Sequence, residues 1–86
     1  MTSTTAVLAE LADRVRHVPP RMFAIYGVYA DAKDGEYPGW IQWGLEFPDQ
    51  AKAVAWSPGS THLASSAEEI LKSGELMGPA RLVWFG

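Results

Sequence analysis

The chain has 86 residues, of which 48% are hydrophobic and 20% charged, and its formal net charge is −3 at pH 7. This composition is sufficient for a single domain with its own hydrophobic core, and it excludes a typical disordered chain. The acidic balance excludes the basic surface expected of a nucleic-acid-binding protein. The absence of cysteine excludes disulfides, zinc thiolate sites and a cysteine nucleophile.

The N-terminal segment predicts a short polar start followed by an amphipathic helix. Residues 1–5 are expected to fray, and either Thr4 or Thr5 can serve as the N-cap. Apolar residues then fall at helical spacing and form one stripe: Val7, Leu8, Leu11, Val15 and Val18. Pro19 and Pro20 end the helix. Because the stripe is apolar, we expect this helix to pack against the rest of the chain.

The middle of the chain predicts an antiparallel meander of three to four strands. Strands are expected over residues 21–31, 40–47 and 51–56, and a short fourth strand over 61–64. A charged loop, residues 31–39, joins the first two strands.

The clearest of these strands is residues 40–47. Alternate residues of a strand point to the same face, and we call each such set a parity; here one parity is wholly apolar. We expect this parity to face the core: Ile41, Trp43, Leu45 and Phe47. The other parity is mixed and is expected to be partly open to solvent: Trp40, Gln42, Gly44 and Glu46.

A second, short helix and a final strand complete the predicted fold. Ser65 or Ser66 can cap this helix, with a glutamate three residues later, and Gly74 is expected to end it. The final strand covers residues 80–85, and the strand–helix–strand connection allows it to lie parallel to an earlier strand. The predicted fold class is α+β, a two-layer sandwich in which both helices cover one face of the sheet, over a single domain of residues 1–86.

Motifs for metal and phosphate chemistry are missing from the sequence. Two histidines far apart and no cysteine give no transition-metal spacing. The glycines fall at separate turns and form no phosphate-binding loop. We therefore expect neither a metal nor a cofactor.

His62 is the residue best suited to acid–base chemistry near neutral pH. It follows a turn that contains Ser57 and Ser60, and Asp49 or Glu46 could act as its carboxylate partner. This turn does not match the nucleophile elbow of hydrolases. A non-enzymatic role is therefore favoured, and a small enzyme or ligand-binding domain is the alternative.

The outward parity of the clearest strand predicts a partner-binding surface. Trp43, Trp56 and Trp84 share parities with apolar side chains and are expected in the core, whereas Trp40 shares its parity with polar residues. Aromatic side chains on an open sheet face are typical anchors of protein interfaces. The alternative is that the second helix or the loop covers Trp40. The predicted surface combines this parity with the charged loop: Trp40, Gln42, Glu46, Tyr37, Glu36 and Asp34.

The C-terminal third carries a capped helix, Ser66-Ala-Glu-Glu-Ile-Leu-Lys-Ser-Gly, and then the segment Gly78-Pro79-Ala80-Arg81-Leu82-Val83-Trp84. These segments are similar to the C-terminal helix and strand of small bacterial immunity proteins, which neutralise polymorphic toxins. The sequence departs from that pattern after Trp84, where Phe-Gly stands in place of a polar residue. The N-terminal helix has no counterpart in the pattern. The resemblance implies a cytoplasmic bacterial protein that inhibits a partner protein.

The sequence therefore predicts a small binding protein whose partner is another protein or a second copy of itself. A self-associating structural subunit, joined through an edge strand, is a further alternative. The N-terminus has no basic region typical of a signal peptide, and no apolar run approaches the ~18 residues of a membrane span, so we expect a cytoplasmic location. The sequence leaves open the identity of the partner, the strand order, the oligomeric state, any small-molecule ligand and the exposure of Trp40.

Overall fold

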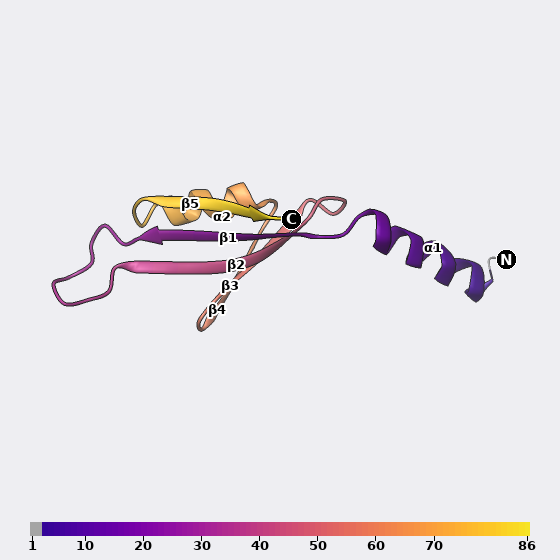
Figure 1. Ribbon diagram of the computed structural model, residues 1–86, viewed down its shortest axis with the longest axis horizontal. Coiled ribbons are helices and arrows are strands. Elements are labelled where there is room, and N and C mark those ends of the chain that lie inside the picture. The colour runs from indigo at the N-terminus through magenta and orange to yellow at the C-terminus, as the bar shows by residue number, and fades with distance from the viewer. Residues whose placement is uncertain (1–2) are drawn as a thin grey trace.

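The computed structural model describes residues 3–86, which form two helices and one five-stranded sheet (Figure 1). In chain order the elements are α1 (Thr4–His17), β1 (Arg21–Val28), β2 (Gly39–Phe47), β3 (Lys52–Ser57), β4 (Ser60–Ala64), α2 (Ala67–Glu75) and β5 (Ala80–Phe85). The predicted α+β order of elements is confirmed, and the short fourth strand is present.

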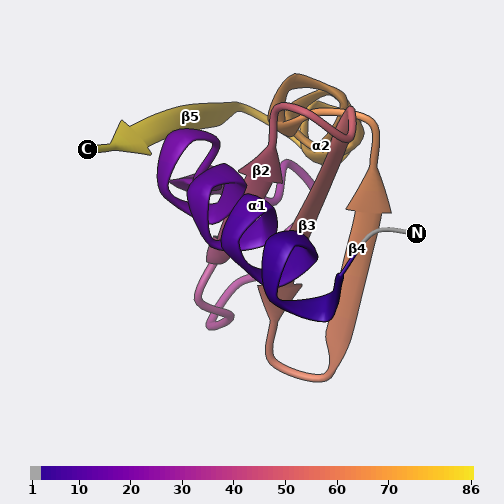
Figure 2. The ribbon, with the colours of Figure 1, turned by 90° about the vertical axis from the view of Figure 1, so that its right-hand side faces the viewer.

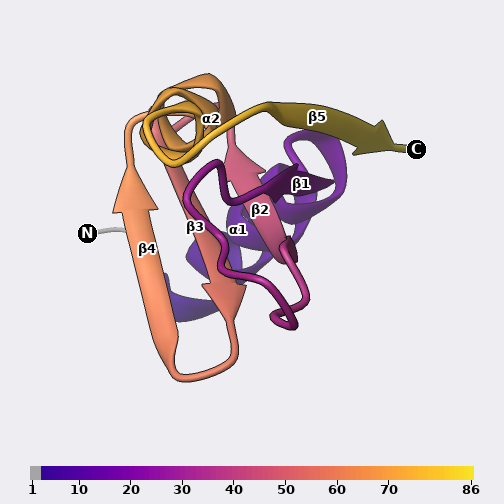
Figure 3. The same cartoon turned by 90° about the vertical axis from the view of Figure 1, so that its left-hand side faces the viewer.

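The strands lie in the order β4-β3-β2-β1-β5, and every neighbouring pair is antiparallel. The first four strands form the predicted meander, and α2 then carries the chain from β4 at one edge to β5 at the other (Figure 3). Because a helical connection returns the chain in its original direction, β5 runs the same way as β4. The final strand thus lies parallel to an earlier strand, as the sequence allowed, but its hydrogen-bonded neighbour is β1, with which it pairs antiparallel.

Helix α2 covers one face of the sheet and closes the core. Phe23 and Ile25 of β1 and Ile70 of α2 are fully buried. The sheet positions on the α2 side include many small residues, which leave room for the helix to lie close: Gly27, Gly44, Ala53, Ala55 and Ala80.

The pairing register places the predicted core parity of β2 on the uncovered face. Phe23 lies opposite Gly44, so the parity of β2 that contains Gly44 and Trp40 points toward α2. Successive side chains of a strand alternate between faces. Ile41 is therefore on the other side, where it is 53% exposed, and Trp43 is 49% exposed.

The expectation that Ile41, Trp43, Leu45 and Phe47 form the core is therefore wrong. A period-two pattern shows that the two faces of a strand differ, but it does not show which face a helix covers. Here α2 lies over the parity with smaller residues, and the aromatic-rich parity stays uncovered. The same correction applies to Trp56, which is 45% exposed, whereas Trp84 packs against the core as expected.

Helix α1 extends away from the sheet and contacts no other element of the described chain (Figures 1 and 2). Its N-cap is Ser3, whose hydroxyl accepts a hydrogen bond from the Ala6 amide at 3.1 Å, so Thr4 and Thr5 lie within the helix. Residues 1 and 2, where the expected fraying begins, lie outside the described residues. No α1 side chain is buried, and the molecule measures 65 × 20 × 20 Å. The expectation that both helices cover one face of the sheet is wrong.

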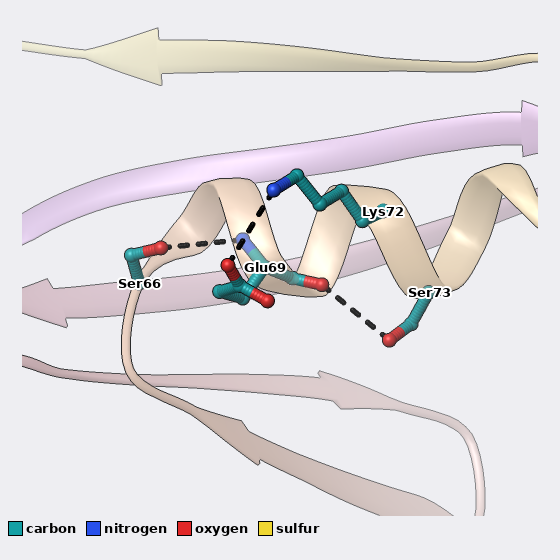
Figure 4. Close-up of polar contacts among 4 residues, drawn as sticks. All are labelled: Ser66, Glu69, Lys72 and Ser73. Carbon is teal, nitrogen blue, oxygen red and sulfur yellow. Dashed lines mark hydrogen bonds and ion pairs between the residues drawn. The ribbon is translucent and has the colours of Figure 1, made fainter.

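Local side-chain contacts define the start of α2 (Figure 4). The Ser66 hydroxyl accepts a hydrogen bond from the Glu69 amide at 3.2 Å, which selects Ser66 as the cap. Lys72 Nζ lies 3.6 Å from Glu69 Oε1 one turn later, and Ser73 Oγ donates to the Glu69 carbonyl at 3.4 Å. Gly74 lies inside the helix, not after its end as expected.

Candidate protein-binding surface

The sheet face opposite α2 presents a set of exposed apolar side chains, and we call this surface the open face. Its residues belong to the strand parity that points away from α2. Nine large apolar side chains on it are 37–74% exposed: Met22, Tyr26, Val28, Ile41, Trp43, Trp56, Leu63, Val83 and Phe85. Leu45, Phe47 and Val54 on the same face are partly buried. No element of the described chain covers this face.

Aromatic rings lie beside one another across the open face. Trp43 of β2 is directly opposite Trp56 of β3 in the pairing register. Trp43 also stacks with Phe85 of β5, with ring centroids 5.8 Å apart and an interplanar angle of 27°. Cross-strand aromatic pairs stabilise a sheet surface, and exposed tryptophans are frequent anchors of protein interfaces.

The formal charges on the open face are few and basic. Among the described strand residues of this parity, only Lys52 and Arg81 are charged. Arg81 Nη1 donates a hydrogen bond to the Ala80 carbonyl at 2.9 Å, which holds its guanidinium beside β5. The centre of the open face is therefore apolar and aromatic, with basic groups on strands on either side of it.

A hollow of about 1000 Å³ lies where the open face meets the loop between β1 and β2. Its wall combines strand side chains of the open face with two loop tyrosines and with two side chains of the α2 side. The open-face residues include Tyr26, Ile41, Trp43 and Trp56, the loop supplies Tyr29 and Tyr37, and the α2 side supplies Trp40 and Gln42. The apolar surface therefore continues past the strands and onto the loop.

The predicted partner-binding residues divide between two places. Trp40, Gln42 and Glu46 are partly buried on the α2 side of the sheet, not on the open face. The Trp40 ring lies between Gly27 and Gly74, because a Cβ added at either glycine would come within 2.7 Å of it. Of the two alternatives for Trp40, cover by the second helix is therefore the one found.

Asp34, Glu36 and Tyr37 are exposed in the loop between β1 and β2, and Tyr37 is 88% exposed. Tyr37 also lines the hollow, so the loop adjoins the open face. Of the predicted contact residues, Tyr37, Trp40 and Gln42 line the hollow, whereas Asp34 and Glu36 are exposed loop residues outside its lining.

Glu46 has a structural partner in α2. Its Oε1 accepts a hydrogen bond from the Ala67 amide at 2.9 Å, at the first residue of the helix. The amides of the first helical turn lack partners within the helix, and negative charge is favourable there. Glu46 therefore fixes the start of α2 to β2.

The groups proposed for acid–base chemistry are not brought together. His62 of β4 is partly buried on the α2 side of the sheet, and Asp49 is exposed in the turn after β2. Within residues 3–86, no hydrogen bond or ion pair joins His62 to a carboxylate, and the Ser57 and Ser60 hydroxyls bond to each other at 2.8 Å. The same residues contain no group of three or more metal-ligating side chains.

Sequence reasoning missed the open face, although a usable signal was present. The parity that does not include Trp43 and Trp56 contains Gly44 in β2 and Ala53 and Ala55 in β3. Small residues at neighbouring positions of one sheet face leave room for a helix, so they indicate the covered side. The face with the larger side chains is then the one left for a partner.

No family model matches this sequence, and comparisons with curated proteins and with solved structures gave no match. Neither helix of the described chain is long and apolar enough to span a membrane. The inference about function therefore rests on the geometry and chemistry of the open face.

Proposed function

We propose that this protein is a small non-enzymatic binding module that uses the open face to bind a protein partner. The observation that carries this proposal is the uncovered set of large apolar side chains on that face. Monomeric soluble proteins rarely expose a contiguous apolar patch larger than a few hundred Å², and larger patches mark surfaces that bind a protein, a membrane or a ligand. At ~200 Å² per large side chain, the exposed parts of these residues total roughly 800 Å², about what one partner contributes to a standard interface.

The side chains of the open face indicate which chemical groups the partner's contact surface must have. Trp43 and Trp56 are the expected anchors, because tryptophans at the centre of an interface commonly contribute most of its binding energy. The partner's complementary surface is apolar at its centre. Asp34, Glu36 and Tyr37 in the adjoining loop supply a polar rim. The resemblance to immunity proteins implies one form of this role, the inhibition of a toxin.

Affinity capture tests whether the open face is the binding surface. Tagged wild-type protein is compared with Ile41→Lys, which places a charge at the centre of the open face. The matched control is Leu76→Lys, because Leu76 is 88% exposed and lies outside the open face. The bait is expressed in cells that also contain the untagged chain, and retained chains are identified by mass spectrometry.

We expect the wild type and Leu76→Lys to retain the same chains, untagged copies of this chain included, and Ile41→Lys to lose them. Far-UV circular dichroism verifies that the fold is intact in each variant. Equal retention by all three baits would contradict the proposal, because binding would then not depend on the open face.

A further inference from the structure

The chain contains two apolar surfaces that nothing in the described structure covers: the open face and the stripe of α1. The stripe consists of Val7, Leu8, Leu11 and Val15 of α1 and of Val18, the C-cap residue, and these side chains are 37–73% exposed. On a helical wheel they occupy one side of α1, and Ala9 and Arg16 lie on the other side. An apolar helix stripe and an apolar sheet face can each remove the other from water, so the two surfaces are complementary.

Helix α1 also needs a partner for its own stability. It has 14 residues, and isolated helices shorter than ~12–15 residues are marginal in water. Most helical stability in proteins comes from packing of the apolar side. The Ser3 cap and basic residues in the last turn contribute only modestly, so the exposed stripe indicates a helix that packs on another surface.

The linker between α1 and β1 directs α1 away from its own sheet. It consists of Val18, Pro19 and Pro20, and each proline has a fixed φ. Val18 and Pro19 each precede a proline, which disfavours the α region that a chain reversal requires. Val18 has φ −130° and ψ 59°, and α1 extends outward from the start of β1 (Figure 1). The linker therefore holds α1 where a second molecule can reach it.

The dimensions of α1 match those of the open face. A helix of 14 residues is about 21 Å long at ~1.5 Å per residue. A sheet of five strands is about 19 Å wide at ~4.8 Å per spacing. One copy of α1 can therefore lie across the sheet, and the exposed apolar area of roughly 800 Å² per copy is that of a standard interface.

We infer that the open face is covered by α1 of a second copy of this chain, in a reciprocal two-fold dimer. Each copy supplies its α1 to the other's sheet, so both apolar surfaces are removed from water. Such an exchange closes with two copies, which leaves no surface for further growth. This inference rests on the proposed function, because it names the occupant of the same open face.

The oligomeric state of the full chain tests this inference. Sedimentation equilibrium compares the wild type with Leu11→Glu on the stripe and Ile41→Lys on the open face. Ala9→Glu is the matched control for Leu11→Glu, because it adds the same charge to the opposite side of the same helix. Leu76→Lys is the control for Ile41→Lys. Val15→Glu repeats the stripe test at a side chain that is 73% exposed.

We expect the wild type and both controls to have twice the 9.4 kDa mass of one chain. Leu11→Glu, Val15→Glu and Ile41→Lys are expected to be monomers, with dissociation constants raised at least 100-fold. Their tryptophan emission is expected to shift to longer wavelength as Trp43 and Trp56 become exposed. Circular dichroism and urea unfolding verify that the sheet is intact in each variant.

A monomeric wild type would overturn the inference, and so would a dimer that survives Leu11→Glu and Val15→Glu. Equal disruption by Ala9→Glu would also overturn it, because the stripe would then not be the contact. In each of these cases the proposed function still stands if Ile41→Lys loses its captured partners. The proposed function itself fails if Ile41→Lys retains the same chains as the wild type and Leu76→Lys, or if none of the three baits retains a chain.

Discussion

At the scale of single residues, Glu46 joins strand β2 to the start of helix α2. Its carboxylate accepts a hydrogen bond from the amide of Ala67, a residue that is 0% exposed. Because of this contact, Glu46→Lys would damage the fold as well as alter a surface charge. Glu46 is therefore unsuitable as a probe of partner binding, although the sequence predicted it as a contact residue.

Removal of the Glu46 carboxylate is expected to destabilise the protein. Glu46→Ala leaves the buried Ala67 amide without this acceptor, and we expect a loss of about 1–3 kcal/mol in the free energy of unfolding. Glu46→Gln keeps an oxygen acceptor and loses only the charge at the helix start, so we expect about 0.3–1 kcal/mol. Urea unfolding followed by tryptophan fluorescence measures both. Losses near zero for both variants would contradict this role.

The packing of Trp40 between two glycines gives a second residue-scale prediction. Gly74→Ala gains up to about 1 kcal/mol of helix propensity. The new Cβ would lie 2.7 Å from the Trp40 ring, and overpacking of this kind costs about 1–3 kcal/mol. We therefore expect Gly74→Ala to destabilise the wild type.

A double-mutant cycle separates these two effects of Gly74→Ala. In a Trp40→Phe background the overlapping ring atom is gone, so the same substitution is expected to be neutral or stabilising. Urea unfolding of the four proteins in the cycle measures the coupling. A stabilising effect of Gly74→Ala in the wild type would show that the Trp40 ring has room to move.

At the scale of elements, the first turn of α2 shows which of two candidate serines is the cap. The Ser66 hydroxyl accepts from the Glu69 amide, whereas no side-chain hydrogen bond is found for Ser65 in the described structure. Ser66→Ala is expected to reduce the free energy of unfolding by about 1 kcal/mol. Ser65→Ala is expected to change it by less than about 0.5 kcal/mol. Thermal unfolding followed by circular dichroism distinguishes the two.

Helix α1 shows how far an amphipathic pattern can be used for prediction. The apolar stripe and the two prolines predict the helix and its end, because both signals are local. The position of the helix depends on the conformation of Val18 and on the surface that the stripe meets. Neither is encoded in the spacing of apolar residues, so the helix was predicted correctly and its packing on the sheet was not.

At the scale of the whole molecule, the order of elements was predicted from the sequence, and the covered face of the sheet was assigned to the wrong side. Strands and helices follow from residue periodicity and turn residues, which are properties of short segments. The covered face of β2 depends on how α2 crosses the sheet, because both of its parities carry large side chains such as Trp40 and Trp43. The sequence therefore placed the candidate surface on the side of β2 that α2 covers, whereas the exposed apolar side chains lie on the other face of the same strand.

The linker of residues 18–20 has a consequence for how the protein responds to its own abundance. A helix that its linker directs away from its own sheet makes cover of the open face a bimolecular event, governed by mass action. In dilute solution the tryptophans would be free for another partner, and at higher concentration a second copy would occupy them. Self-association would then compete with every other ligand of the open face. The concentration of the protein would therefore determine what fraction of its open faces is free to bind another partner.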